Sequence, residues 1–194
     1  MQYFHHLGLA KGARVFVPLC GKTVDIAWLI DQGFRVCGIE LSRMAVDELF
    51  EALAAKPSIQ NRSELTQYSA GDLDIFVGDV FSLSADLLGP VDAIYDRAAL
   101  VALPEPMRVR YSVQLRRITG LAPQLVVCFE YDQNLMDGPP FSIRESELEA
   151  LYADDYKIRQ LASVDVVGGL KGQCPATEVA WLLERTRATS DGDP

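Results

Sequence analysis

Residues 14–22 constrain the fold more than any other part of the chain. They read R-V-F-V-P-L-C-G-K, a short apolar run with β-branched and aromatic residues that closes on Gly21. A helical pattern, T-V-D-I-A-W-L-I-D-Q, follows directly in residues 23–32. Such an order is typical of a buried parallel strand, a glycine turn and a helix. The segment therefore predicts the first half of a nucleotide-binding βαβ unit, in which Gly21 lets a ligand approach the backbone closely.

Residues 35–41 supply the second half of this unit. They read R-V-C-G-I-E-L, an apolar strand that ends near Glu40, about twenty residues after the glycine turn. An acid at the tip of the second strand can accept hydrogen bonds from both hydroxyls of a ribose. A solvated acid at a strand end would have the same sequence pattern, and the spacing alone leaves both interpretations open.

The glycine turn differs from the dinucleotide fingerprint. The sequence P-L-C-G-K has the single glycine Gly21, where a dinucleotide site has G-x-G-x-x-G. A diphosphate would lack its usual series of backbone amides. The turn therefore disfavours a nicotinamide oxidoreductase and indicates an adenosine ligand without a diphosphate, such as S-adenosylmethionine.

Composition narrows the class of protein. The 194 residues suit one domain, predicted over residues 1–186, with a disordered tail at residues 187–194. The net charge of −9 argues against nucleic acid or an anionic membrane as partner. The four cysteines show neither a C-x-x-C pair nor a zinc spacing, which favours reduced thiols in a cytoplasmic protein and predicts no metal site. No signal peptide or membrane-spanning run is predicted.

Further strands are predicted at residues 73–80, 91–95 and 124–131. Asp79 at the end of the first of these either lies beside an adenine or caps the following turn. The strand at residues 91–95 delivers Asp96 and Arg97 to the ligand edge, unless the two form only a local ion pair. Residues 56–71 are interpreted as a polar connection with one short strand near residues 67–70. The arginines of the helix at residues 104–119 are interpreted as solvent-facing, and residues 157–166 and 178–185 as an antiparallel hairpin.

Four stretches of the sequence share the motifs of one family. They are V-F-V-P-L-C-G-K-T-V-D-I-A-W-L, V-C-G-I-E-L-S, Y-D-R-A-A-L-V-A-L-P, and F-E-Y-D followed by G-P-P-F. In these motifs the chain resembles the thiopurine S-methyltransferases, especially the bacterial members. The resemblance implies a monomeric α/β protein with the class I S-adenosylmethionine-dependent methyltransferase fold, which is Rossmann-like. That fold has a seven-stranded, mostly parallel sheet flanked by helices, with a C-terminal antiparallel hairpin.

The resemblance also implies a set of cofactor-binding residues. Leu19 and Gly21 would line S-adenosylmethionine, and Glu40 would bind its ribose. Asp79 and Val80 would lie beside its adenine. One departure concerns the start of the chain, because the family carries a helix and loop with tryptophan before this point. The sequence thus predicts either a misassigned start or a missing N-terminal cap over the cofactor.

Arg97 is the residue to which the resemblance gives a catalytic role. It would also bind the cofactor, because it would sit between cofactor and acceptor, where its charge orients an anionic acceptor and favours the thiolate. An aromatic thiol ionises near neutrality, so no general base is required. The implied activity is methyl transfer to the sulfur of thiopurines or other small aromatic thiols. Two alternatives are methylation of small selenium, tellurium or sulfide species at the same site, and a truncated, non-catalytic relative.

Overall fold

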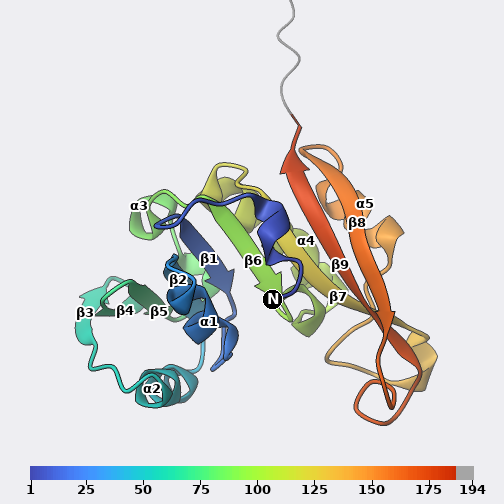
Figure 1. Cartoon of the computed structure of the whole chain (residues 1–194), viewed down its shortest axis with the longest axis horizontal. Coiled ribbons are helices and arrows are strands. Elements are labelled where there is room, and N and C mark those ends of the chain that lie inside the picture. Colours follow the sequence, from blue (N-terminus) through green and yellow to red (C-terminus); the bar gives the residue numbers. More distant parts are fainter. Residues whose placement is uncertain (187–194) are drawn as a thin grey trace, which may run out of the picture.

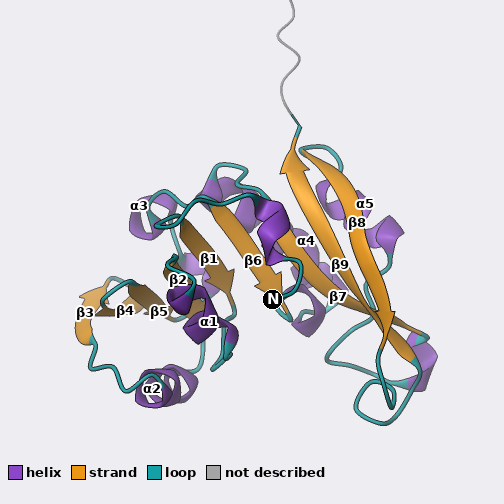
Figure 2. Ribbon diagram, in the orientation of Figure 1, coloured by secondary structure: helices purple, strands orange, loops and turns teal. Residues whose placement is uncertain are grey.

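The computed structural model describes residues 1–186, and the tail predicted at residues 187–194 lies outside them. Within residues 1–186 the chain forms nine strands: β1 (Arg14–Pro18), β2 (Arg35–Glu40), β3 (Ser58–Arg62), β4 (Leu65–Ala70), β5 (Leu73–Val77), β6 (Ala93–Arg97), β7 (Gln124–Tyr131), β8 (Tyr156–Asp165) and β9 (Ala176–Arg185). They join one sheet in the order β3-β4-β5-β2-β1-β6-β7-β9-β8 (Figures 1 and 2). That residues 1–186 are a single domain stays a prediction.

The five strands at the centre of the sheet, β5-β2-β1-β6-β7, run parallel. The chain adds β2 and β5 on one side of β1 and then returns to place β6 on its other side. The strand order therefore reverses between β1 and β6, and the arrowheads of both strands point to the same edge (Figure 1). Open α/β sheets bind ligands beyond the carboxyl ends of their strands at such a reversal. The residues that follow β1, β2, β5 and β6 thus share the edge where a ligand is expected.

Helices cover both faces of the central strands (Figure 2). The α-helices are α1 (Asp25–Asp31), α2 (Arg43–Ala52), α3 (Ala85–Leu88), α4 (Glu105–Thr119) and α5 (Glu145–Tyr152), and the short 3-10 helices are η1 (Phe4–Leu7), η2 (Val80–Ser82), η3 (Leu100–Ala102) and η4 (Gln133–Leu135). None of the helices within residues 1–186 combines the length and apolarity needed to cross a bilayer.

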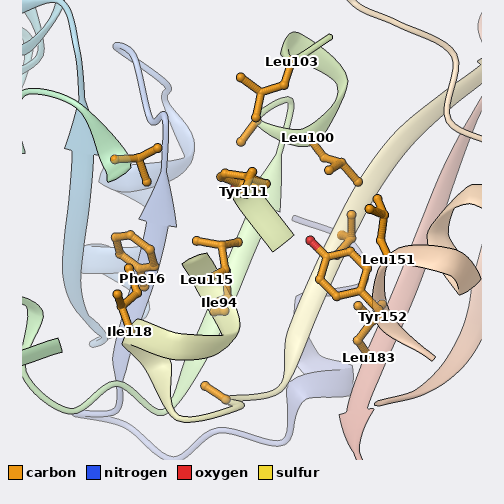
Figure 3. Close-up of a cluster of buried hydrophobic side chains, with 14 of the residues drawn as sticks. Phe16, Ile94, Leu100, Leu103, Tyr111, Leu115, Ile118, Leu151, Tyr152 and Leu183 are labelled. Atoms are coloured by element: carbon orange, nitrogen blue, oxygen red, sulfur yellow. The ribbon is translucent and has the colours of Figure 1, made fainter. Parts of the chain in front are cut away.

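The core consists of two main clusters, one on each face of the sheet. Alternate residues of a strand point to opposite faces. In β1, Phe16 accordingly joins the cluster under α4 and α5, while Val15 joins the cluster under η1, α1 and α2. Figure 3 shows the first cluster, in which Tyr111 and Leu115 of α4 lie close to Ile94 of β6. Both faces of β1 are therefore buried, which explains its continuous apolar sequence.

The expected α/β architecture with a parallel centre is confirmed, and so is the antiparallel hairpin of β8 with β9. The sheet, however, has nine strands where seven were predicted, and it is mixed, because β3, β4, β8 and β9 pair antiparallel with their neighbours. β3 and β4 lie in the segment interpreted as a polar connection. β4 contains the short strand predicted near residues 67–70, whereas β3 was not predicted. Every residue of β3 is exposed. Because β3 is an edge strand with no buried face, it lacks the apolar alternation that identifies a strand from sequence.

The interpretation of the α4 arginines as solvent-facing is wrong for Arg108. This residue is 6% exposed, forms an ion pair with Glu147 of α5, and donates a hydrogen bond to the Leu103 carbonyl at 2.7 Å. Arg116 is half-buried and pairs with Asp155 at 2.6 Å. These two arginines tie α4 to α5 and to the turn that follows α5.

Candidate active site

The loop after β1 turns sharply at two residues with left-handed backbone. Leu19 has φ 46° and Gly21 has φ 53°. This region suits glycine and is strained for other residues, so the strain at Leu19 falls inside the candidate site. The amide of Cys20 between them donates to the carbonyl of Ile39 in β2, at 3.1 Å. A Cβ at Gly21 would meet no atom within 4 Å. The backbone of Gly21 therefore has open space beside it, and its contact with a ligand stays a prediction.

Glu40 ends β2 beside this loop. Its Oε2 accepts a hydrogen bond from the Gly21 amide at 2.8 Å, and its Oε1 accepts one from the Ser42 amide at 2.8 Å. Ser42 in turn caps α2, because its hydroxyl accepts from the Ala45 amide. Both carboxylate oxygens of Glu40 are thus held in place. Each has a further lone pair, so the carboxylate can still accept hydrogen bonds from a ligand.

A small pocket opens at the ends of β2 and β5. Its volume is about 100 Å³, and its lining residues are Leu19, Ile39, Glu40, Leu41, Gly78, Asp79, Val80, Phe81, Leu103 and Met107. Four of the predicted cofactor residues therefore meet in one pocket, which is apolar apart from its two carboxylates. The sequence did not identify Phe81, Leu103 or Met107 as part of it. Leu103 and Met107 come from a segment far along the chain, and no local pattern relates them to Glu40.

Asp79 caps η2 at the edge of this pocket. Its Oδ1 accepts a hydrogen bond from the Phe81 amide at 3.0 Å. Of the two interpretations of Asp79, the capping one is confirmed. The adenine role stays a prediction, and Asp79 remains exposed at the pocket rim.

Arg97 ends β6 and lies outside the lining of this pocket. Its Nη1 donates to Oδ2 of Asp25, the first residue of α1, at 2.9 Å. Burial alone would lower the pKa of the Arg97 guanidinium, but the hydrogen bond and the negative charge of Asp25 raise it. Asp96 points the other way and is fully buried, so Asp96 and Arg97 form no local ion pair. Arg97 is therefore a stable cation at the ligand edge of the sheet.

Asp25 is a residue of the site that the sequence analysis missed. It is 2% exposed, and its partner Arg97 is 72 positions away in the chain. A signal was available, since Asp25 is a carboxylate in a helix that is otherwise apolar toward the sheet. No sequence pattern, in contrast, identifies Arg97 as the partner of Asp25.

The loop after β7 spans residues 132–144 and contains η4. It is attached on two sides: the Phe141 amide donates to the Val101 carbonyl at 2.6 Å, and Lys171 Nζ donates to the Pro139 carbonyl at 2.7 Å. The loop thus connects η3 with the turn between β8 and β9. It stands beside the segment that carries Leu103, one wall of the small pocket.

A larger cavity of about 670 Å³ lies at the turn between β8 and β9. Glu130, Asp165, Cys174 and Thr177 are among its lining residues, and none of the predicted site residues lines it. We therefore assign the candidate site to the strand ends around Glu40 and Arg97.

Solved structures of other proteins share the fold of this chain. The chain is similar to an S-adenosylmethionine-dependent methyltransferase from Methanosarcina mazei, with TM-score 0.68 and 16% identity over 92% of this chain and 95% of that one. It is also similar to 1,6-didemethyltoxoflavin-N1-methyltransferase of Burkholderia thailandensis, solved with S-adenosylhomocysteine, with TM-score 0.60 and 18% identity over 94% and 75% of the chains. The fold is that of the S-adenosylmethionine-dependent methyltransferases.

Sequence comparison gives the particular family. The family model of thiopurine S-methyltransferase matches residues 1–187. The thiopurine S-methyltransferase of Xanthobacter autotrophicus is 57% identical, over 95% of this chain and 87% of that protein. That of Teredinibacter turnerae is 49% identical, over 94% of this chain and 85% of that protein. The chain belongs to the thiopurine S-methyltransferase family.

Proposed function

We propose that this protein transfers the methyl group of S-adenosylmethionine to the sulfur of a thiopurine or another small aromatic thiol. Family membership supports the reaction class. The single observation that carries the proposal to this site is the pair of hydrogen bonds that orient the Glu40 carboxylate beside the open backbone of Gly21. The Glu40 carboxylate can accept hydrogen bonds from the ribose hydroxyls, and the open backbone of Gly21 leaves space for the ribose to approach.

We assign the cofactor to the strand ends as follows. Glu40 accepts hydrogen bonds from the ribose hydroxyls, and the loop of Leu19 and Gly21 lies along the ligand. Asp79 and Val80 flank the adenine in the small apolar pocket, where an aromatic ring gains from burial. The fit is supported by the chemistry of the pocket, since its walls are apolar and its carboxylates suit hydroxyl and amino donors.

We assign Arg97 to the boundary between cofactor and acceptor. S-adenosylmethionine supplies a methyl group that its sulfonium has already activated. The residues of the protein need to hold the acceptor sulfur in line with that methyl group and to exclude water. The Arg97 cation stabilises the thiolate, and an aromatic thiol loses its proton to water near neutral pH without a general base. Arg97 thus serves both in binding and in catalysis.

The test is a direct assay of binding and product. Calorimetric titration of the 194-residue chain with S-adenosylhomocysteine should give micromolar affinity. Incubation with S-adenosylmethionine and 6-mercaptopurine or thiophenol should give the S-methyl product by mass spectrometry. Absence of S-adenosylhomocysteine binding would overturn the cofactor assignment. Binding with methylation of selenite or sulfide but not of aromatic thiols would overturn the acceptor assignment alone.

We further propose that the protein acts as a monomer in the cytoplasm on small-molecule acceptors. All four cysteines are free and buried in the described residues: Cys20, Cys37, Cys128 and Cys174. Thiols of this kind suit a reducing compartment. The family resemblance supports the monomer, and size-exclusion chromatography with light scattering would test it.

A further inference from the structure

Asp25 is a buried carboxylate to which the proposed chemistry gives no role. It begins α1, immediately after the glycine loop, and is 2% exposed. A buried carboxylate is costly unless it is paired and hydrogen-bonded, because burial removes its hydration. The partners of Asp25 therefore account for its presence in the core.

The partners both come from β6. Oδ2 of Asp25 accepts hydrogen bonds from Nη1 of Arg97 at 2.9 Å and from the hydroxyl of Tyr95 at 3.3 Å. Tyr95 and Arg97 are two positions apart in the strand and so share one face of the sheet. α1 lies in front of β1 and β2 in Figure 1, and the side chain of its first residue reaches Tyr95 and Arg97 of β6. Asp25 thus bridges the start of α1 to the carboxyl end of β6.

The three residues differ in how far their side chains are exposed to solvent. Tyr95 and Asp25 are buried, while the Arg97 side chain is 43% exposed. Within residues 1–186 Asp25 is the one hydrogen-bond partner of the Arg97 guanidinium. Asp25 therefore holds one nitrogen of the guanidinium, and the remaining N–H groups are available to a ligand at this edge of the sheet.

We propose that Asp25 is the positioning residue for Arg97. Its carboxylate holds the guanidinium in the orientation in which the remaining N–H groups face the acceptor sulfur, and the Tyr95 hydroxyl holds the carboxylate. The proposal rests on the proposed function, in which Arg97 faces the acceptor. Asp25 itself touches neither substrate nor cofactor in this scheme.

The first experiment compares Asp25→Asn with the wild type. Asn keeps the shape of the side chain but loses its charge, so the guanidinium is no longer held by an ion pair. The kcat/KM for a thiol acceptor at saturating S-adenosylmethionine should fall about 10- to 100-fold, the scale of a misplaced catalytic group. The affinity for S-adenosylhomocysteine should change less than about threefold. The matched control is Asp31→Asn, an exposed acid in the same helix, which should leave both quantities unchanged.

A double-mutant cycle separates positioning from a purely structural role. In an Arg97→Ala background Asp25→Asn should cause little further loss of kcat/KM, because the group that Asp25 positions is already gone. A further loss of the same factor as in the wild type would overturn the proposal. An equal fall of cofactor affinity and kcat/KM in Asp25→Asn would also overturn it.

Further measurements separate a failure to fold from a loss of activity. Thermal unfolding reports whether each variant folds, and Asp25→Glu, which retains the charge, replaces Asp25→Asn in the cycle if the latter does not. Partial activity of Asp25→Glu supports the proposal. A wild-type chain that binds no S-adenosylhomocysteine or methylates no thiol defeats the proposed function and the proposal together. If the wild type is active but the losses of kcat/KM caused by the Asp25 and Arg97 substitutions are additive, only the positioning role of Asp25 is overturned.

Discussion

The carboxylate of Glu40 accepts a hydrogen bond from the backbone amide of Gly21, with Oε2 and N separated by 2.8 Å. Glu40 ends β2 and Gly21 follows the neighbouring parallel strand β1, and the two residues are 19 positions apart in the chain. The Ser42 amide holds the other carboxylate oxygen. The acid that we assign to the ribose therefore also closes the glycine loop, so its loss should affect ligand binding in two ways.

Replacement of Glu40 by Gln should weaken S-adenosylhomocysteine binding about 10- to 100-fold. A hydrogen bond to a charged group contributes about 1.5–3 kcal/mol, and each 1.4 kcal/mol corresponds to a factor of ten. Calorimetric titration measures the change. The control is Glu48→Gln on α2, an acid paired with Lys22 whose side chain is 43% exposed, which should bind as the wild type does. Unchanged affinity in Glu40→Gln would contradict the ribose assignment.

Replacement of Arg97 by Ala should lower kcat/KM for thiol acceptors about 100-fold, the usual scale for losing a group that stabilises charge in the transition state. Cofactor affinity should fall less than about tenfold, because Glu40 and the adenine pocket remain. Steady-state kinetics and calorimetry measure the two effects. Arg43→Ala, which removes an exposed arginine paired with Asp47, serves as the control. Equal losses in both measurements would count against the acceptor-side role of Arg97.

Replacement of Gly38 by Ala should destabilise the fold by about 1–3 kcal/mol, the usual cost of overpacking a core. A Cβ at this position of β2 would lie 2.7 Å from Cδ1 of Ile75, 3.0 Å from Sγ of Cys20 and 3.2 Å from the carbonyl oxygen of Val17. The two side chains can shift, but the backbone carbonyl of β1 cannot shift without disturbing the sheet. Urea denaturation measures the free energy of unfolding. A midpoint equal to that of the wild type would show that β1 and β2 have room to separate.

The stability of the wild type relative to Asp96→Asn should decrease as the pH rises from 4 to 7. Burial raises the pKa of Asp96 to about 6 from 3.8, although hydrogen bonds from the Tyr111 hydroxyl and the Leu100 amide oppose the shift. The folded state therefore holds this proton more tightly than the unfolded state, and stability is lost as the carboxyl ionises. The total change is on the order of 2 to 3 kcal/mol.

Denaturation of both proteins at pH 4, 5, 6 and 7 measures this difference. The neighbouring Tyr111, Tyr152 and Cys128 have pKa values raised well above their usual ranges by burial, so they stay neutral throughout. A change with pH in the stability difference between the two proteins is thus attributable to Asp96. If the free energy of unfolding changed with pH in the same way for both proteins, the Asp96 carboxyl would not titrate in this range.

The sequence by itself determined the elements whose signals are local. The apolar run before Gly21 predicts β1, the acid about twenty residues later predicts the end of β2, and residues 124–131 were predicted with the bounds that β7 has. These predictions succeed because a strand buried on both faces is apolar throughout and because a βαβ unit has a characteristic length. β3 was not found, since an exposed edge strand needs no apolar residues.

The tertiary structure alone decided which distant residues meet. Asp25 and Arg97 are 72 positions apart, and their ion pair forms only because β6 returns to lie beside β1. Leu103 and Met107 reach the pocket of Glu40 through the path of the chain after β6. Asp96 and Arg97 are adjacent, yet one is buried and the other is an exposed cation, because successive residues of a strand point to opposite faces. Contacts of this kind depend on strand order and burial, which a single sequence does not record.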